Sequence, residues 1–188
     1  MAIRLFCLAL PPAAETARGV IASGVDLTVP DCCALPLRVQ VLCTAPMQVF
    51  CASDAAPALA TLLESAVQAG SVATIRGCSA LRGRDFGQWT GMALSTLPVD
   101  AVQALTQDAG FIPPEGESWR QFTARLMCWL DTAVPDGTQA LLMAAPSVLV
   151  AFMQGIVAPT ATAPPDLDMA EGAWLALTRN TRWRVRLL

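Results

Sequence analysis

The chain has 188 residues and no histidine, which excludes every reaction that needs an imidazole nucleophile, base or metal ligand. With 54% hydrophobic and 14% charged residues it is too apolar to be disordered, and we expect one compact domain over residues 1–188. The formal net charge is −3, and all twelve basic residues are arginines without a basic stripe, which argues against nucleic-acid binding.

The seven cysteines do not indicate a disulfide framework, because their number is odd and most lie in apolar runs. Free, buried thiols in a reducing cytoplasm fit better. No Cys-x-x-Cys pair and no histidine are present, so we expect neither a zinc site nor any other metal or cofactor. The apolar run 5–10 is too short to span a membrane, and it stops at Pro11.

The first half of the chain predicts a buried strand at Ile3–Leu8, followed by a loop. The segment Cys33–Thr44 fits both an alternating strand and a helix, and we favour the helix. Residues 48–52 are typical of a short buried strand. A helix capped by Ser53 or Asp54 is then predicted to end at Gly70.

The middle of the chain predicts a strand at Ser71–Ile75, a glycine-rich and arginine-rich loop at 77–91, and a short helix from Asp100. Ser118 and Gln121 then form a capping box for a long helix. One face of that helix carries Trp119, Phe122, Leu126, Trp129 and Ala133.

The last third predicts a buried strand at Ala140–Ala145, an apolar helix at Ser147–Val157, and two closing strands within Gly172–Leu187. The proline-rich stretch 158–165 is interpreted as a surface excursion. Four arginines near the end are interpreted as the solvated face of the last strands. Alternating strands and helices predict an α/β three-layer sandwich, with a mostly parallel central sheet and helices on both faces.

Two motifs resemble the histidine phosphatase, or phosphoglycerate mutase-like, superfamily. The stretch 81–91, Leu-Arg-Gly-Arg-Asp-Phe-Gly-Gln-Trp-Thr-Gly, is similar to the family's Leu-x-Glu-x-x-Phe-Gly-x-Trp-x-Gly pattern. Residues 114–118, Pro-Glu-Gly-Glu-Ser, resemble the family's Pro-Gly-Gly-Glu-Ser turn, which opens a long helix. Spacing and length are most similar to the alpha-ribazole phosphatases, and the order of predicted strands agrees over nearly the whole chain.

The resemblance fails at the family's catalytic positions. The Arg-His-Gly motif after the first strand corresponds to Ala9, Leu10 and Pro11, and an arginine after the next strand corresponds to Ala56. The family's acid corresponds to Gly83 and its second histidine to Ala145. The resemblance therefore implies no catalytic residues in this chain.

Other residues near the expected site have plain structural explanations. Phe86, Trp89 and Trp119 are interpreted as packing aromatics, and Glu117 as an anion at a helix N-terminus. A residual ligand pocket would contain Arg82, Arg84, Pro146 and Ser147, although we expect the two arginines to be surface charges on a loop. The backbone N–H groups at the start of the Ser147 helix are a further, weak anion site.

Two Cys-x5-Arg matches, Cys32 to Arg38 and Cys78 to Arg84, have the spacing of cysteine phosphatases. Neither has the strand, glycines and helix that such a loop needs. The leading hypothesis is a catalytically degenerate protein that binds an unknown small molecule or protein. The alternatives are a phosphoric monoester hydrolase of altered chemistry, with a substrate such as alpha-ribazole phosphate, and a structural subunit that forms a homodimer.

Overall fold

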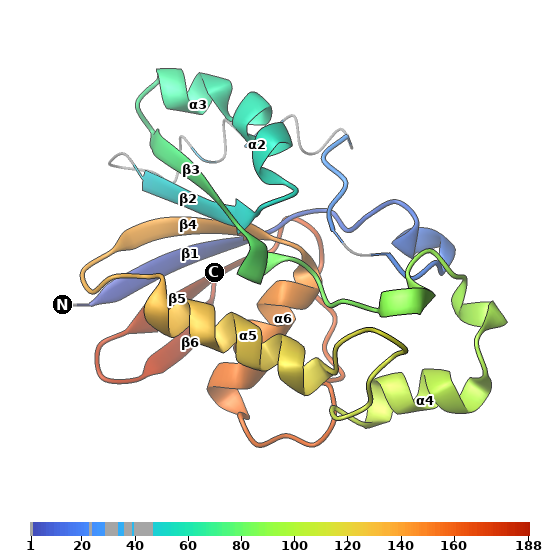
Figure 1. The fold of residues 1–188 in the computed structure, drawn as a ribbon. Helices are drawn as coiled ribbons and strands as arrows, with labels where there is room; N and C mark the ends of the chain where they lie inside the picture. The colour runs from blue at the N-terminus through green and yellow to red at the C-terminus, as the bar shows by residue number, and fades with distance from the viewer. Residues whose placement is uncertain (1, 23, 29–33, 36–38, 40–46) are drawn as a thin grey trace.

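The computed structural model describes residues 2–22, 24–28, 34–35, 39 and 47–188. Its centre is a six-stranded sheet with the order β3-β2-β4-β1-β5-β6 (Figure 1). The strands are β1 (Ile3–Ala9), β2 (Met47–Ala52), β3 (Val72–Cys78), β4 (Gln139–Ala144), β5 (Trp174–Arg179) and β6 (Trp183–Leu187). The first four run parallel, and β5 pairs antiparallel with both β1 and β6.

Helices cover both faces of the sheet, which confirms the predicted α/β sandwich (Figure 1). The covering helices are α2 (Ala56–Leu62) and α3 (Glu64–Gln68) on one face and α5 (Trp119–Thr132) and α6 (Pro146–Val157) on the other, while α4 (Val99–Gln107) lies apart from the sheet (Figure 1). One core packs α5 and α6 against one face, around Phe122, Phe152 and Leu142. The other packs α2 and α3 against the opposite face, around Leu59 and Leu141. Alternate residues of each central strand feed the two cores.

The apolar run at the start of β1 is buried, as the sequence predicts, since Ile3, Leu5 and Leu8 are fully inaccessible to solvent. The region 33–44 lies mostly outside the described residues. Of its residues, Leu35 and Val39 are helical and buried against the α2 face. No helix in the described part of the chain is long and apolar enough to cross a membrane.

The capping box of α5 is present as predicted. Ser118 Oγ accepts from the Gln121 N–H at 3.1 Å, and Gln121 Oε1 accepts from the Ser118 N–H at 2.8 Å. The predicted cap at residues 53–54 is wrong, because α2 begins at Ala56 without a side-chain cap. Pro57 explains the later start, since proline has no N–H and is favoured in the first turn of a helix. Gly70 ends α3 at a φ of 73°, as expected.

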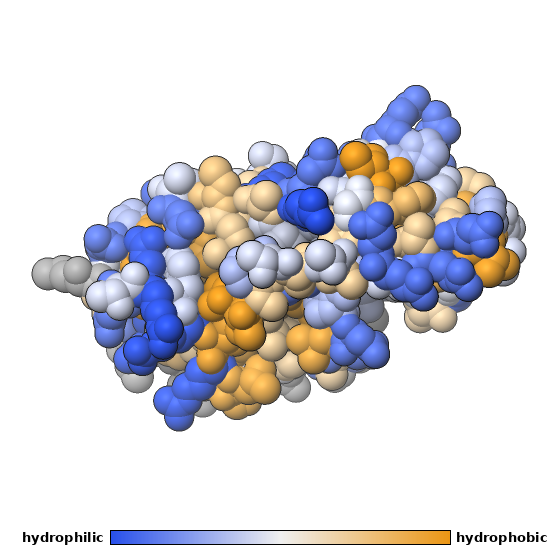
Figure 2. Space-filling view, turned by 90° about the horizontal axis from the view of Figure 1, so that it is seen from below, coloured by the Kyte–Doolittle hydropathy of each residue, from blue (hydrophilic) through white to orange (hydrophobic). Residues whose placement is uncertain are grey.

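The last two strands carry the arginine-rich face predicted from the sequence. Arg184 and Arg186 are exposed on β6, whereas Trp183 and Val185, which alternate with them, are half-buried. Arg179 bridges Asp131 and Asp136. Seen from below the view of Figure 1, the surface shows hydrophobic residues in separate patches between hydrophilic ones (Figure 2).

Two turns that carry the recognised motifs pack backbone to backbone. The Glu117 N–H donates to the Asp85 carbonyl at 2.9 Å, and the Gln88 N–H donates to the Pro114 carbonyl at 3.0 Å. A Cβ added at Gly87 would lie 2.1 Å from the Pro114 oxygen, and one added at Gly116 would lie 2.7 Å from the Asp85 oxygen. Both glycines are therefore required by close approach. We call this pair of turns, residues 85–88 and 114–117, the clasp.

The clasp yields a first prediction. Gly87 and Gly91 both have positive φ, but a Cβ at Gly91 meets no atom within 4 Å. Gly91→Ala should therefore cost only the backbone strain, about 1–2 kcal/mol of unfolding free energy. Gly87→Ala adds a collision with backbone and should cost at least about 3 kcal/mol. Urea unfolding of both variants measures the difference, and equal destabilisation would contradict the packing described here.

Candidate functional site

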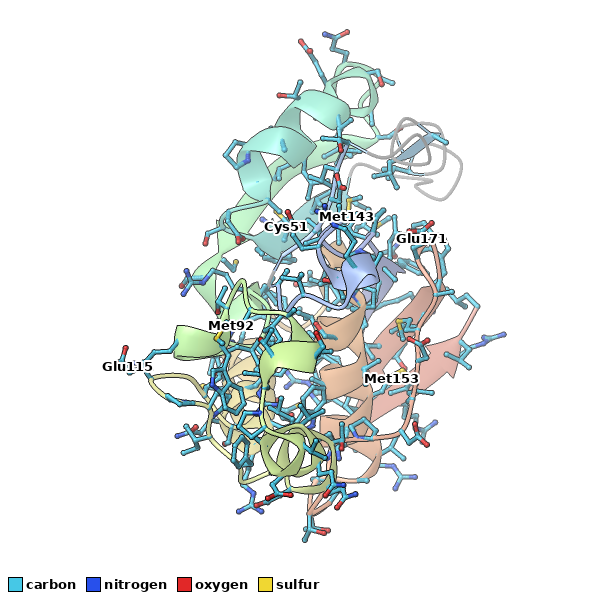
Figure 3. The ribbon with its side chains drawn as sticks, turned by 90° about the vertical axis from the view of Figure 1, so that its right-hand side faces the viewer. Cys51, Met92, Glu115, Met143, Met153 and Glu171 are labelled. Atoms are coloured by element: carbon cyan, nitrogen blue, oxygen red, sulfur yellow. The ribbon has the colours of Figure 1, made fainter. Side chains whose placement is uncertain are left out.

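The carboxyl ends of β1 and β4 meet at one edge of the sheet. The strands pair in parallel register up to Ala9 and Ala144, and the Leu10 N–H donates to the Ala144 carbonyl at 2.8 Å. Leu10 and Ala145 therefore lie next to each other, and they are 1% and 8% exposed. Figure 3 views this edge, with Cys51 and Met143 near the ends of β2 and β4. Ligands of open α/β sheets commonly bind at such an edge.

A pocket of about 330 Å³, here called the strand-end pocket, opens between these strand ends. Leu10, Gly83 and Ala145 all line it, so three of the positions singled out from the sequence converge on one hollow. Asp26 and Asp54 are its charged lining residues. Ala56 packs instead against β3, where a Cβ added at Gly77 would lie 2.9 Å from the Ala56 Cβ.

A hollow of about 570 Å³ adjoins the strand-end pocket and shares Gly24, Gly83 and Ala145 with it. Because of this connection we call it the main cleft. A neighbouring side cleft of about 640 Å³ shares several walls with the main cleft. These shared residues are Thr16, Ala22, Arg84, Phe86, Trp119, Pro164 and Pro165. Three residues of the expected ligand pocket, Arg84, Pro146 and Ser147, line the main cleft, whereas Arg82 is exposed and lies outside its lining.

The expectation that Arg84 is a surface charge is wrong. Arg84 is only 5% exposed. Its guanidinium donates from Nε to the Glu117 carbonyl at 3.0 Å and from Nη2 to the Phe111 carbonyl at 3.1 Å. The guanidinium also lies 5.2 Å from the centre of the Phe86 ring. Burial lowers its pKa, partly offset by the charge of Glu117. Arg84 is therefore a buried link between its own loop and the backbone at Phe111 and Glu117.

The sequence gives no reason to single out Arg125, which organises the loop before the clasp. It forms an ion pair with Glu117 and donates to the carbonyl groups of Ala80, Arg82 and Gly83. The Glu117 carboxylate in turn accepts from the Asp85 N–H at 2.9 Å. The role of Glu117 is thus larger than that of a helix-terminal anion. The sequence signal for this ion pair is only the opposite charge of Glu117 and Arg125 at a spacing of eight residues, about two turns of a helix.

The start of α6 offers little to an anion. Pro146 has no N–H, and the Val148 and Leu149 N–H groups both donate to the Ala145 carbonyl, at 3.0 and 3.4 Å. Of the first three positions of the helix, only Ser147 therefore has an N–H group that no hydrogen bond described here uses. One such N–H group is a weak anion site compared with the several that usually hold phosphate at a helix N-terminus.

The whole chain is similar to known proteins. The model of the histidine phosphatase superfamily (branch 1) matches residues 38–188. This chain belongs to the histidine phosphatase superfamily. No curated protein matches the sequence.

Several solved structures superpose on nearly the full length of this chain, although their sequences are less than 20% identical to it. YhfR from Bacillus stearothermophilus is 15% identical with a TM-score of 0.78, covering 98% of this chain and 96% of its own. The alpha-ribazole phosphatase from Shigella flexneri is 19% identical with a TM-score of 0.72, covering 98% and 95%. A mycobacterial glucosyl-3-phosphoglycerate phosphatase is 18% identical with a TM-score of 0.73, covering 100% and 98%. At these identities the likeness shows the fold.

The cysteines of this superfamily member do not form a phosphate loop in the described part of the chain. Cys78 ends β3 half-buried, and Arg84, its partner in the spacing match, is engaged with carbonyl groups. Burial raises the pKa of Cys51 to about 11, and burial also raises that of Cys7, so neither thiol ionises readily. Cys128 is exposed on α5, contrary to the expectation of buried thiols. The Cys32–Arg38 match lies outside the described residues.

No metal site is visible in the part of the chain that the structure describes, since no three cysteine or acidic side chains come together. The charged groups around the strand-end pocket are carboxylates. The hydrogen bonds from the Thr28 hydroxyl and N–H lower the pKa of Asp26. An anionic ligand therefore finds no cation among the residues that line the strand-end pocket.

The loop geometry yields a second prediction. Arg125→Ala leaves the partly buried Glu117 carboxylate and three carbonyl groups without their donor. We expect a loss of about 2–4 kcal/mol in unfolding free energy, measured by urea denaturation. Arg18→Ala is the matched control, because its pair with Glu15 is exposed and 3.8 Å apart, and it should change stability by less than about 0.5 kcal/mol. Similar effects of both variants would refute the assigned role of Arg125.

Proposed function

We propose that this member of the histidine phosphatase superfamily is catalytically degenerate and acts as a binding module, a single cytoplasmic domain whose cleft takes a ligand. The observation that carries the proposal is chemical: the sequence has no histidine, and the superfamily's histidine positions correspond to Leu10 and Ala145. The adjacency of these two residues at the carboxyl ends of β1 and β4 supports the correspondence.

The lost groups account for every part of the superfamily's reaction. An imidazole with a pKa of about 6.5 is the nucleophile that forms the phosphohistidine, and a leucine side chain has no lone pair. Arginines and the second histidine stabilise the charge on the phosphoryl oxygens, each contributing about 3 kcal/mol. Ala9, Ala56 and Ala145 contribute none of this. Gly83 cannot protonate a leaving alcohol, a step that contributes roughly 100-fold or more.

The open cleft supports binding over a purely structural role. Had the space between Leu10, Gly83 and Ala145 been filled by larger side chains, the site would serve only the core. The strand-end pocket has about 330 Å³ and the main cleft about 570 Å³. Pockets for small molecules usually have 300–1,000 Å³.

A second candidate is a phosphatase of altered chemistry that hydrolyses a small phosphate ester such as alpha-ribazole phosphate. The comparisons favour this candidate, because two of the three solved structures described above are named as phosphatases. The residue chemistry favours the first candidate, since the described cysteines lack the setting of an activated nucleophile.

The third prediction separates the two candidates. Turnover of para-nitrophenyl phosphate and of alpha-ribazole phosphate should not exceed the blank, because no nucleophile or general acid replaces the missing groups. A histidine-containing member of the superfamily, assayed in parallel, is the positive control.

A saturable rate clearly above the blank would refute the degenerate state. In that case, iodoacetamide treatment together with the Cys78→Ser and Cys32→Ser variants shows whether a thiol is the nucleophile. If the rate survives all three, the nucleophile is another group and the cysteine hypothesis fails.

A further inference from the structure

The charge around the cleft is opposite to what a phosphate ester needs. Among the described residues, the main cleft is lined by Asp168 and Glu171, the side cleft by Asp166, and both by a single cation, Arg84. The adjoining strand-end pocket adds two more carboxylates and no cation. Asp166, Asp168 and Glu171 are exposed at the rim of the clefts, where their charges favour a positive ligand and repel an anion.

Arg84 does not reverse this balance, because its guanidinium is committed to the protein. Two of its nitrogens donate to the Glu117 and Phe111 carbonyl groups, and its plane lies over Phe86. Turning the guanidinium toward an anion in the cleft would break these contacts and leave two carbonyl groups without donors. The cation on the wall of the cleft is thus a structural group.

The walls of the main cleft are apolar and aromatic. Trp119 and Phe86 are its aromatic lining residues, and Val150 and Met169 are among its aliphatic ones. The Trp119 ring is fixed by an edge-on contact with Phe122 and by a hydrogen bond from its indole N–H to Gln154 Oε1. A fixed indole in a cleft that carboxylates also line suits an organic cation, since aromatic faces attract positive charge.

The acidic side of the cleft is built by the segment between α6 and β5, which includes the proline-rich stretch expected to be a surface excursion. Pro164, Pro165, Leu167, Asp168 and Glu171 of this segment all line the main cleft. The Ala163 carbonyl accepts from Gln154 Nε2 at 2.7 Å, and the Gly172 N–H donates to the Ala9 carbonyl at 2.8 Å. Because the segment is bonded at both ends, its carboxylates keep their place at the rim. Figure 3 shows Glu171 on this segment.

We propose that the main cleft binds a small organic cation, an ammonium or guanidinium group carried on an apolar body of one or two rings, and rejects phosphate esters. The proposal rests on the binding role argued above and adds the class of ligand. The apolar body lies against Trp119, and the positive group faces Asp168 and Glu171. The cleft volume of about 570 Å³ suits a ligand of this size.

The test compares three probes of one shape and different charge: 2-(1-naphthyl)ethylamine, 1-naphthylacetamide and 1-naphthylacetate. Dissociation constants are measured by calorimetry at 20 mM and 300 mM NaCl. At low salt the ammonium probe should bind at least about tenfold tighter than the carboxylate probe, with the amide between them, because both rim carboxylates act on the charge. The preference should shrink at high salt, since the rim is exposed.

The double variant Asp168→Asn/Glu171→Gln should reduce the preference to within about twofold. It keeps the acceptor that the Met169 N–H uses at Asp168. The matched control Asp100→Asn/Glu64→Gln removes the same charge on α4 and α3, outside the lining residues, and should leave the preference unchanged.

Three results would overturn the proposal: equal or tighter binding of the carboxylate probe, an unchanged preference in the cleft variant, or no binding of any probe. None of them would restore phosphatase chemistry, which the turnover assay tests separately. Conversely, turnover on a phosphate ester would refute the degenerate state whatever the probes show.

Discussion

The parallel pairing of β1 and β4 is the constraint on which the site depends. Six residues of each strand are in register, from Arg4 and Gln139 to Ala9 and Ala144, and the last three pairs are buried on both strands. Two parallel strands in register end at the same edge of the sheet, so Leu10 and Ala145 must be neighbours. The side chains of Leu10 and Ala145 therefore help to set the chemistry of this edge.

The second constraint is the clasp, which fixes the loop that carries Gly83 and Arg84. Two glycines allow its turns to touch through their backbones, and Glu117 with Arg125 holds the adjoining loop. The motifs that identify the superfamily in the sequence are, in this chain, structural motifs. Their packing and hydrogen bonding give these residues a structural role that does not depend on the chemistry of the site.

The sequence predicts the sheet and most helices because their signals are local. Apolar runs mark β1, β2 and β4, and the capping box at Ser118 marks the start of α5. Long-range structure is harder to predict. The burial of Arg84 depends on carbonyl groups of residues 111 and 117, and the closeness of the segment 164–171 to Trp119 depends on how α6 packs. Neither contact leaves a periodic or compositional trace in the chain.

The candidate site divides in the same way. The resemblance to the superfamily places Leu10, Gly83 and Ala145 in one pocket, and the structure brings those three together. The structure does not place Arg82 in the lining of the main cleft. The composition of the chain also gives no indication that Asp168 and Glu171 line this cleft. The sign of the charge at a site is a property of the tertiary arrangement, whereas a net charge of −3 constrains it very little.

Vanadate binding tests most directly whether this edge of the sheet has lost its capacity to hold a phosphoryl group. Equilibrium dialysis should detect no saturable vanadate binding at concentrations up to about 1 mM, because the described residues that line the strand-end pocket include two carboxylates and no cation, and the chain has no histidine. Saturable binding in the micromolar range, lost when Leu10 is replaced by Trp to fill the pocket, would contradict the account.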